Sequence, residues 1–366
     1  MLYRRIKDQQ VSLLGYGGTR FPRSEEGVID EELTKALFTA GYNQGINYFD
    51  TAYIYYDGLS EKILGDWLQT VERSRVNIAD KLPVWLCKNK EDVYHYFNEQ
   101  CQRLQCGYID FYLIHSLDSD NWKIVKEIGA YEVLRQLQDQ GKIRYLGFSF
   151  HDDYEVFEEI LNTYDWDFCQ IQFNYMDKDY QAGRRGVKLA EEKGVPIVVM
   201  EPLKGGLLAT LPQGEKQILN SAYSDAALAL RWVAGFDQVA VILSGMGSEE
   251  KLQDNLTTIS NFEPLSQGEE AKLTEVAKAV AARTIVPCTA CEYCLPCPAQ
   301  VNIPRCFRYI NFAYQYDNFD ISSHNYNAEK DGFASLCIDC GNCVSMCPQH
   351  IDVPECLKLV VEKFGK

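Results

Sequence analysis

Most of the cysteines in this chain gather near its C-terminal end, in two tandem runs. Of the 14 cysteines, 10 fall between residues 288 and 356. The later run has the spacing C-x2-C-x2-C-x3-C before a proline, and consists of Cys337, Cys340, Cys343 and Cys347. The earlier run is one residue shorter in its last gap, also precedes a proline, and consists of Cys288, Cys291, Cys294 and Cys297. Thiolates in tandem at this spacing are ligands of iron–sulfur clusters, so the two runs predict one-electron redox chemistry.

The two runs resemble those of a bacterial-type dicluster ferredoxin. In such proteins the fourth cysteine of each run binds the other cluster. The resemblance implies one [4Fe–4S] cluster held by Cys288, Cys291, Cys294 and Cys347, and a second held by Cys337, Cys340, Cys343 and Cys297. Structural zinc and disulfides are the alternatives. Zinc sites prefer two separated pairs of cysteines, and a disulfide framework needs a secretory context that the sequence does not show.

The remaining cysteines follow no such pattern. Cys306 and Cys356 each lie nine residues beyond a predicted ligand, on segments with the character of short helices. The others are scattered through the first 280 residues and form no pair in the sequence: Cys87, Cys101, Cys106 and Cys169. Free cysteine commonly serves as a small buried apolar side chain, and we expect that role for all of them.

A second set of chemically capable residues lies at the ends of apolar segments in the first third of the chain. The segment INYFD ends at Asp50, and Tyr55 follows five residues later. The segment VNIAD is followed by Lys81, and IDFYLIH ends at His115. In a barrel of parallel strands the carboxyl ends of the strands meet at one mouth, so we expect these side chains to converge there.

These residue types together suit the reduction of a carbonyl group. The neutral hydroxyl of Tyr55 can give a proton to the carbonyl oxygen, which gains charge during hydride transfer. The ammonium group of Lys81 is expected to lower the pKa of this tyrosine, and Asp50 would hold the lysine in place. His115 could orient the carbonyl oxygen or relay the proton. Each residue alone is a weak signal, because the chain has 23 tyrosines and an Asp–Lys pair at a strand end is often structural.

Short apolar segments alternate with amphipathic stretches over the first 260 residues and must position these groups. Eight segments are predicted as strands, beginning near Val11, Ile46, Val76, Ile109, Tyr145, Phe168, Pro196 and Val239. Several are apolar on both faces, as parallel strands buried on both sides should be. Helices are predicted between them, with Gly41 as a C-terminal cap and with Ser60 and Ser248 as N-terminal caps.

The number of strands favours an α/β fold, a (β/α)8 TIM barrel. A doubly wound open sheet is the competing arrangement. It requires a glycine-rich turn that opens a helix after the first strand. The segment 15–18, Gly-Tyr-Gly-Gly, has the glycines, but no amphipathic helix follows it directly.

The character of the sequence changes after about residue 282, where Cys, Pro, Asn and aromatic residues replace periodic apolar patterns. The tail also contains an internal repeat, since residues 288–306 match residues 337–356. Both copies have spaced cysteines, Cys-Pro, an apolar-Asx-apolar-Pro segment and a final Cys. We therefore expect a barrel domain over residues 1–282 and a small C-terminal ferredoxin-like iron–sulfur domain over residues 283–366.

The composition excludes several classes of protein. The 366 residues include 36 basic and 52 acidic side chains, which gives a formal net charge of −16. Such a chain lacks the basic footprint of a protein that binds nucleic acid or an anionic membrane, so neither is expected as a partner. No apolar run approaches the roughly 18 residues of a membrane span, and no signal peptide is recognisable. Dense cysteines without an export signal predict a cytoplasmic protein.

The first 280 residues resemble the aldo-keto reductase family. The segment NYFDTAYIYYDGLSEKILG matches the family's Asp-Thr-Ala segment, with a tyrosine five residues after the aspartate. The resemblance implies a nicotinamide cofactor, NADH or NADPH, and a catalytic tetrad of Asp50, Tyr55, Lys81 and His115. It implies that Ser149 and Gln170 contact the nicotinamide carboxamide of the cofactor. It further implies that Leu203 and Gly205 contact the pyrophosphate, and that Lys251 and Asn255 contact the adenosine end. With its tail, the chain resembles the ferredoxin-fused subgroup of the family.

Three positions depart from the family pattern. Asp80 stands where threonine is common, and Phe150 where many members have asparagine. Gly245 stands where many NADPH-dependent members have a basic residue. Lys251 is then the one positive side chain of residues 244–251, beside two glutamates. We therefore expect NADH, or at most a weak preference for NADPH.

The combination of the two predicted domains admits three interpretations of function. In the first, the barrel reduces a small-molecule carbonyl substrate, and the clusters are structural or regulatory. In the second, the clusters feed electrons to a substrate at the barrel mouth, with a ferredoxin or flavodoxin as a candidate donor and without obligatory nicotinamide. In the third, the barrel is a non-catalytic redox-sensing or electron-transfer module, against which the complete tetrad argues. A cluster moves one electron and nicotinamide moves a hydride, and no signature of a flavin that could convert between them is visible.

Overall fold

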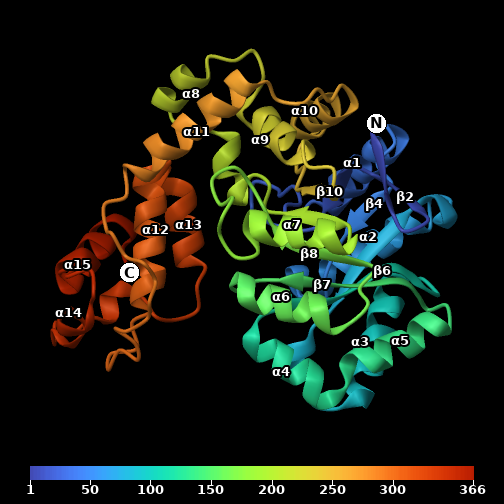
Figure 1. The fold of residues 1–366 in the computed structure, drawn as a ribbon, viewed down its shortest axis with the longest axis horizontal. Helices are drawn as coiled ribbons and strands as arrows, with labels where there is room; N and C mark the ends of the chain where they lie inside the picture. Colours follow the sequence, from blue (N-terminus) through green and yellow to red (C-terminus); the bar gives the residue numbers. More distant parts are fainter. The chain divides into compact units, whose positions relative to one another are not determined.

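The computed structural model describes residues 1–366 and divides the chain into two compact units (Figure 1). The first unit comprises Met1–Ala209 with Tyr223–Ser266, and the second comprises Thr210–Ala222 with Gln267–Lys366. None of the helices has both the length and the apolar character needed to cross a membrane.

The first unit is built on a closed barrel of parallel strands. Around the barrel the strands follow the order β10-β3-β4-β5-β6-β7-β8-β9. Their bounds are Leu14–Gly17 (β3), Tyr48–Asp50 (β4), Asn77–Leu82 (β5), Ile109–Leu117 (β6), Ile143–Phe150 (β7), Phe168–Gln172 (β8), Ile197–Met200 (β9) and Val239–Ser244 (β10). The predicted (β/α)8 TIM barrel is confirmed, and the open doubly wound sheet is excluded.

The interior of the barrel is filled by side chains from alternate positions of its strands. Phe111 lies at the centre of this cluster, with its ring centroid 5.1 Å from that of Tyr48 and 5.3 Å from that of Phe168. All three rings are fully buried. Burial of each large side chain stabilises the fold by about 1.5–3 kcal/mol, so the barrel is a packed core and leaves only its mouth for a ligand.

The first predicted strand is wrong in its position. Val11 belongs to an antiparallel hairpin of β1 (Tyr3–Ile6) and β2 (Gln9–Ser12), and the barrel strand begins only at Leu14. Ile6 and Val11 are fully buried in the interior cluster of the barrel. The hairpin therefore closes the amino end of the barrel, and a single apolar run in the sequence serves two different sheets.

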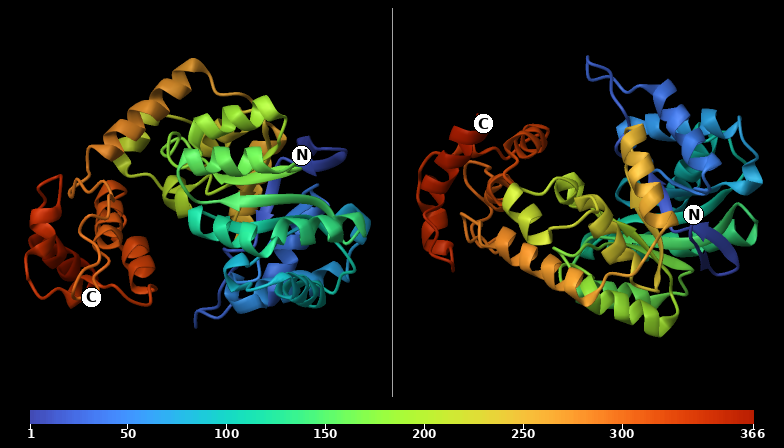
Figure 2. Two further views of the ribbon diagram at one scale, coloured as in Figure 1. Left: turned by 60° about the horizontal axis from the view of Figure 1, so that its bottom comes forward. Right: turned by 90° about the horizontal axis from the view of Figure 1, so that it is seen from above.

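Helices that connect successive strands cover the outside of the barrel (Figure 2). Their bounds are Glu31–Asn43 (α1), Leu59–Leu68 (α2), Lys90–Arg103 (α3), Ser119–Ile128 (α4), Ala130–Asp139 (α5), Tyr154–Thr163 (α6), Gly183–Lys193 (α7), Asp225–Ala234 (α9) and Glu249–Ser260 (α10).

Of the three predicted helix caps, only Ser248 is confirmed, where the hydroxyl accepts a hydrogen bond from the third N–H of α10. Gly41 lies inside α1, where the lack of a side chain makes room for the residues that follow the helix. Ser60 lies in the first turn of α2 and receives a hydrogen bond of 2.9 Å from the hydroxyl of Thr51. Gly58, with a φ of 84°, is the cap residue of α2, because a left-handed backbone is needed there.

Cys101 and Cys106 form a close pair, contrary to the expectation of isolated thiols. The N–H of Cys106 donates to the carbonyl of Cys101 at 3.1 Å, and Gln105 between them has a φ of 50°. This is a Schellman turn at the end of α3, which brings the side chains at these two positions together. The contact with Cys101 lowers the pKa of Cys106, and neither cysteine is fully buried. The expected burial holds for Cys87 and Cys169.

The second unit is helical. Its helices are Gln213–Leu219 (α8), Gln267–Ala281 (α11), Ile303–Gln315 (α12), Phe319–Asn327 (α13), Asn342–Met346 (α14) and Val353–Phe364 (α15). Their apolar faces meet in a core of their own, in which Phe307, Ile310, Leu357 and Val360 are buried.

The internal repeat of the sequence corresponds to two helices that begin in the same way. Asn302 caps α12 and Asp352 caps α15, and each side chain accepts a hydrogen bond from an N–H three residues later. Proline follows in the first turn of both helices, where no N–H is needed. Cys306 on α12 is fully buried, as expected, whereas Cys356 on α15 is partly exposed.

The second unit includes more of the chain than the residues after 282. Lys272 of α11 donates a hydrogen bond of 2.6 Å to the carbonyl of Leu219, and Arg283 pairs with the buried carboxylate of Glu215. These contacts join α11 to the segment 210–222, which contains α8. The predicted domain boundary between residues 282 and 283 stays a prediction. The contacts within each unit divide the chain earlier, before α11 begins at Gln267.

Candidate active site and cluster sites

Three neighbouring strands carry three of the four predicted catalytic side chains to the carboxyl end of the barrel. Asp50 is the last residue of β4, Lys81 lies near the end of β5, and His115 lies near the end of β6. The parallel pairing of these strands makes their ends adjacent. Tyr55 follows β4 in a tight turn, η1 (Tyr55–Gly58), whose second and third residues have left-handed backbones.

Lys81 and Asp50 form a buried ion pair. The Nζ atom of Lys81 lies 2.7 Å from Oδ1 of Asp50 and donates a second bond of 2.6 Å to the carbonyl of Thr51. Lys81 is 1% exposed and Asp50 is 4% exposed. Burial alone would lower the pKa of Lys81, but Asp50 and Tyr55 raise it above its ordinary value. The lysine is therefore charged at neutral pH and fixed in direction.

Tyr55 lies against this ammonium group. The Nζ atom of Lys81 is 5.0 Å from the centre of the tyrosine ring. Burial raises the pKa of Tyr55 above its ordinary value, and the charge of Lys81 opposes this rise without overcoming it. The expected effect of the lysine is present, but desolvation outweighs it. The phenol is thus neutral at pH 7 and keeps the proton that an acid must donate.

His115 is a buried neutral imidazole beside the tyrosine. Its ring centroid lies 6.1 Å from that of Tyr55 and 5.2 Å from that of Trp85. Burial lowers the pKa of His115 well below its ordinary value, and the charge of Lys81 lowers it further. Its Nδ1 atom is buried without a hydrogen-bond partner. Trp85 was not predicted as a site residue, although its position shortly after β5 places it at the mouth.

A partly buried network holds the turn that carries Tyr55. The guanidinium of Arg103 on α3 binds Glu61 at 2.7 Å and Glu99 at 2.5 Å. It also lies 4.3 Å from the ring centre of Tyr53 and donates to the carbonyl of that residue at 3.4 Å. Because Tyr53 is two residues before Tyr55, Arg103 positions the backbone of the turn that carries Tyr55. Nothing in the local sequence indicated this role.

Asp80, which departs from the family pattern, belongs to a buried pair of carboxyl groups. Its Oδ1 atom accepts a hydrogen bond of 2.7 Å from the backbone N–H of Lys81. Burial and the nearby Glu61 raise the pKa of Asp80 well above its ordinary value. One oxygen on each of these two carboxyl groups is buried without another partner, so a proton between them satisfies both. Successive strand residues face opposite sides, so Asp80 supports β5 from behind Lys81.

Ser149 and Gln170 lie side by side on β7 and β8, and both are 1% exposed. The hydroxyl of Ser149 accepts a hydrogen bond of 2.7 Å from the N–H of Ser116 and can still donate its own proton. The Oε1 atom of Gln170 is buried without a partner. A carboxamide offers one acceptor and one donor group, which fits this hydroxyl and this orphan oxygen. Phe150 instead packs in the core against Phe157, with ring centroids 5.2 Å apart.

Leu203 and Gly205 lie on a tight turn after β9. Gly205 has a φ of 65° and Gly206 a φ of 97°. The N–H of Gly206 donates to the carbonyl of Leu203 at 2.9 Å, which closes the turn. Without side chains at these two positions the backbone is accessible, as the approach of a phosphate requires.

Lys251 and Asn255 lie on α10, but they differ in what they can reach. Lys251 is exposed. Asn255 is 4% exposed, and its amide donates a hydrogen bond of 2.7 Å to the hydroxyl of Ser244 at the end of β10. Lys251 can therefore meet a ligand directly, whereas Asn255 chiefly ties α10 to the barrel.

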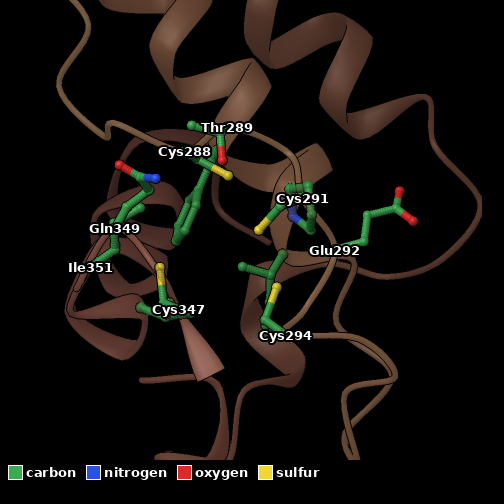
Figure 3. Close-up of a pocket in the computed structure, with 12 residues that line it drawn as sticks. Cys288, Thr289, Cys291, Glu292, Cys294, Cys347, Gln349 and Ile351 are labelled. Carbon is green, nitrogen blue, oxygen red and sulfur yellow. The ribbon is translucent and has the colours of Figure 1, made fainter. Parts of the chain in front are cut away.

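Four of the predicted metal ligands line one small hollow in the second unit. Figure 3 shows the sulfur atoms of Cys288, Cys291, Cys294 and Cys347 around the same space. Apolar side chains such as Phe307 and Ile351 complete the walls. Four thiols that converge from both runs fit the four irons of a [4Fe–4S] cluster, in the combination implied by the exchange of the fourth cysteine.

The other four predicted ligands lie close enough together to act on one another. Burial raises the pKa of Cys343, and the neighbouring thiols of Cys337, Cys340 and Cys297 raise it further. Cys297 therefore lies with the later run despite the short gap that precedes it. Burial raises the pKa of Cys294 of the first group to about 11, and the thiol of Cys343 is among the neighbours that raise it further, so the two groups lie close to each other.

Comparison with known proteins agrees with both units. The sequence matches the aldo/keto reductase family over residues 13–278 and a 4Fe-4S dicluster domain over residues 287–351. L-galactose dehydrogenase of Arabidopsis thaliana is 24% identical, over 73% of this chain and 90% of that protein. NADH-specific methylglyoxal reductase of Escherichia coli is 25% identical, over 69% and 90%. Aldo-keto reductase AMT2 of Alternaria alternata is 28% identical, over 56% of this chain and 65% of that protein.

Solved structures match the barrel. The holo form of aldo-keto reductase AKR11C1 from Bacillus halodurans superposes with a TM-score of 0.64 and 25% identity, over 75% of this chain and 96% of that chain. An aldo-keto reductase from Klebsiella pneumoniae in complex with NADPH gives a TM-score of 0.63 over 76% and 96%, and at 23% identity it supports the fold alone. From the family match and the closed barrel, this chain belongs to the aldo/keto reductase family, as an oxidoreductase with a C-terminal 4Fe-4S dicluster domain.

Proposed function

We propose that this protein reduces a small carbonyl compound, an aldehyde, a ketone or a sugar-like substrate, at the mouth of its barrel. A bound NAD(P)H would supply the hydride. The observation that carries the proposal is the buried Lys81–Asp50 pair against the neutral Tyr55. This combination provides a proton and a fixed positive charge where the carbonyl oxygen becomes negative.

Tyr55 is the general acid of the proposed reaction. Its hydroxyl proton moves to the carbonyl oxygen as negative charge develops there. The ammonium of Lys81 then stabilises the phenolate, and Asp50 keeps that ammonium oriented and balances its charge. His115 is neutral because its pKa lies well below the ordinary value, mainly through burial. It can therefore donate one hydrogen bond that orients the carbonyl oxygen without adding a second positive charge.

The cofactor would lie across the ends of the later strands. Ser149 and Gln170 would hold the carboxamide, the turn at Leu203 and Gly205 would lie along the pyrophosphate, and Lys251 would reach the adenosine end. NADH, or at most a weak preference for NADPH, is expected, because the exposed Lys251 stands beside two glutamates. A relative from Escherichia coli that is named as NADH-specific supports this preference.

Two [4Fe–4S] clusters are proposed for the second unit, one for each group of four cysteines. A cluster carries one electron at a time, whereas a hydride carries two, so the carbonyl reduction proceeds without the clusters. Their proposed role is structural or regulatory. If they instead deliver electrons from a ferredoxin or flavodoxin, the reduced protein should convert the substrate without any nicotinamide.

Replacement of Tyr55 by phenylalanine tests the assignment. With methylglyoxal and other small aldehydes as substrates and NADH as donor, kcat should fall about 10²–10⁴-fold, because a positioned proton donor is lost. The Kd of NADH should change less than twofold, since the hydroxyl acts on developing charge. Tyr53→Phe is the matched control, because its hydroxyl binds Glu99 at 3.1 Å. Activity of Tyr55→Phe within a few-fold of the parent would contradict the proposal.

A further inference from the structure

The turn that ends α3 brings together two cysteines that belong neither to the proposed active site nor to the cluster sites. The N–H of Cys106 donates to the carbonyl of Cys101 at 3.1 Å, and the N–H of Gln105 donates to the carbonyl of Gln102 at 3.2 Å. With the left-handed backbone of Gln105, these two hydrogen bonds define a Schellman turn, whose first and last side chains meet. A disulfide joins Cα atoms about 4.4–6.8 Å apart, so it fits two residues whose backbones already share a hydrogen bond.

The two thiols act directly on each other. The hydrogen bond between them raises the pKa of Cys101 and lowers the pKa of Cys106. The charge of Arg73 also lowers the pKa of Cys106, whereas burial and Asp110 oppose this change. Cys106 therefore loses its proton first, and the thiol of Cys101 donates to its sulfur. Because a thiolate is the attacking group in thiol–disulfide exchange, the pair has one attacking member and one member that can complete the exchange.

Positive charge is held beside the segment that follows Cys106. The Nη2 atom of Arg73 donates to the carbonyl of Tyr108 at 3.1 Å and pairs with Asp110 at 2.7 Å. The guanidinium of Arg144 lies 4.5 Å from the centre of the Tyr108 ring and pairs with Asp110 at 3.0 Å. Two guanidinium groups around one buried carboxylate leave a net positive charge, and positive charge near a cysteine stabilises its thiolate.

Small molecules can reach this pair of thiols. Neither thiol is fully buried, and Gln105 between them is exposed. A Cβ atom added to Gly107, the residue after Cys106, would meet no other atom within 4 Å, so the space beside the pair is open. The other two cysteines of the first unit, Cys87 and Cys169, are buried, and burial raises the pKa of Cys87 to about 12. They serve as internal controls for thiol reactivity.

We propose that Cys101 and Cys106 form a reversible redox site that exchanges electrons with a low-molecular-weight disulfide. The thiolate of Cys106 attacks one sulfur of that disulfide, which forms a mixed disulfide and releases one small thiolate. The sulfur of Cys101 then attacks the sulfur of Cys106, which releases the second small thiolate. The protons of the two protein thiols pass to these two leaving groups. The protein pair is thereby oxidised to one disulfide and the small disulfide is reduced to two thiols, independently of the proposed carbonyl reduction.

The test exposes the full-length protein, with its clusters and without oxygen, to glutathione buffers of increasing disulfide content. Free thiols are then trapped with N-ethylmaleimide, and the protein is digested with trypsin for mass spectrometry. Trypsin cuts after Arg103, so the two cysteines lie on separate peptides, residues 91–103 and 104–123, each with one cysteine. These two peptides should become linked as the disulfide content rises and should separate again after treatment with dithiothreitol. No linkage in glutathione disulfide alone, or linkage of either peptide to residues 288–356 instead, would overturn the proposal.

Two serine variants test the order of attack. In Cys101→Ser, Cys106 should keep glutathione as a mixed disulfide, because the thiol that would release it is absent while the serine hydroxyl can still donate to its sulfur. In Cys106→Ser, Cys101 should acquire glutathione about 10-fold more slowly than Cys106 does in Cys101→Ser. Cys87 should react about 100-fold more slowly than Cys106, since its raised pKa leaves far less thiolate. Equal rates in the two variants, or a rate at Cys87 equal to that at Cys106, would overturn the assignment.

Discussion

The Lys81–Asp50 pair should contribute separately to stability and to catalysis, and a cycle of three variants can tell the two apart. Lys81→Met removes the cation 2.7 Å from Asp50 and leaves a carboxylate that is 4% exposed. The second oxygen of that carboxylate already has no hydrogen-bond partner. Asp50→Asn leaves the buried ammonium unpaired instead. The double variant carries no buried charge at either position.

The expected magnitudes follow from burial. Loss of one partner from a buried ion pair costs about 3–5 kcal/mol, whereas replacement of both partners by neutral groups is far less costly. Burial raises the pKa of Asp50 above its ordinary value even beside Lys81, and in Lys81→Met the cation that opposes this rise is lost. The folded state then binds more protons than the unfolded state. The stability of this variant should therefore recover as the pH falls from 7 to 5.

Urea unfolding monitored by tryptophan fluorescence measures the stability of the first unit alone, because all five tryptophans lie in it. The double variant should regain most of the stability that each single variant loses, yet it should show no more activity than Lys81→Met. A loss below about 1 kcal/mol in Lys81→Met would mean that the pair is not both buried and charged. Recovery of activity in the double variant would mean that the lysine charge has no catalytic role.

Two further predictions concern the metal content and the pH dependence. The protein prepared without oxygen should contain about eight irons and eight sulfides per chain. Cys297→Ser and Cys347→Ser should each retain about four, and stoichiometric zinc without sulfide would contradict the cluster assignment. Burial keeps the pKa of His115 in the folded state well below its value in the unfolded state. As the pH falls below about 6.5, the unfolded state therefore binds a proton at this residue while the folded state does not, and the folded state loses stability. His115→Gln should flatten this loss between pH 7 and 5 in urea unfolding, and an unchanged slope would show that His115 is not buried in neutral form.

The barrel could be predicted because its evidence is local and repeated. Each strand is a short apolar run, each helix follows with its own period, and the number of runs limits the choice of fold. The exception is the run at Val11, which changes from a hairpin to the barrel within a few residues. An apolar residue indicates that its side chain is buried, but it does not indicate which strand pairs with its backbone. The sequence therefore gives no sign of where the hairpin strand ends and the barrel strand begins.

The convergence of the four side chains of the predicted tetrad could be expected from the sequence because parallel strands bring their carboxyl ends to one place. Residues that act through long side chains or distant loops left no such signal. Arg103 reaches Tyr53 and Glu61 from positions 50 and 42 residues away along the chain. Trp85 meets His115 across the mouth, with ring centroids 5.2 Å apart. Their type and spacing do not differ from those of ordinary surface and core residues.

The cysteines show the same difference between local and distant information. Their spacing predicts the groups of four, because each run is short and its geometry is restricted. The contact of Cys101 with Cys106 depends on the left-handed backbone of Gln105, a conformation for which the sequence supplies no glycine. From a spacing of five residues at a helix end, the sequence alone therefore does not tell whether the two side chains meet, because this depends on the conformation of the turn.

Two of the three departures from the family pattern, Asp80 and Gly245, are each matched by a nearby group. Asp80 places a carboxyl group in the core, and Glu61 offers the oxygen with which it can share a proton. Gly245 lacks a basic side chain, and the space that this leaves is taken by Arg20 from another loop. The charge around the loop at Gly245 is set by side chains from other loops as well, so the sum over residues 244–251, with one lysine and two glutamates, describes only part of it. A small residue at a position where relatives have a functional side chain should therefore be assessed together with the neighbouring side chains that occupy the space it leaves.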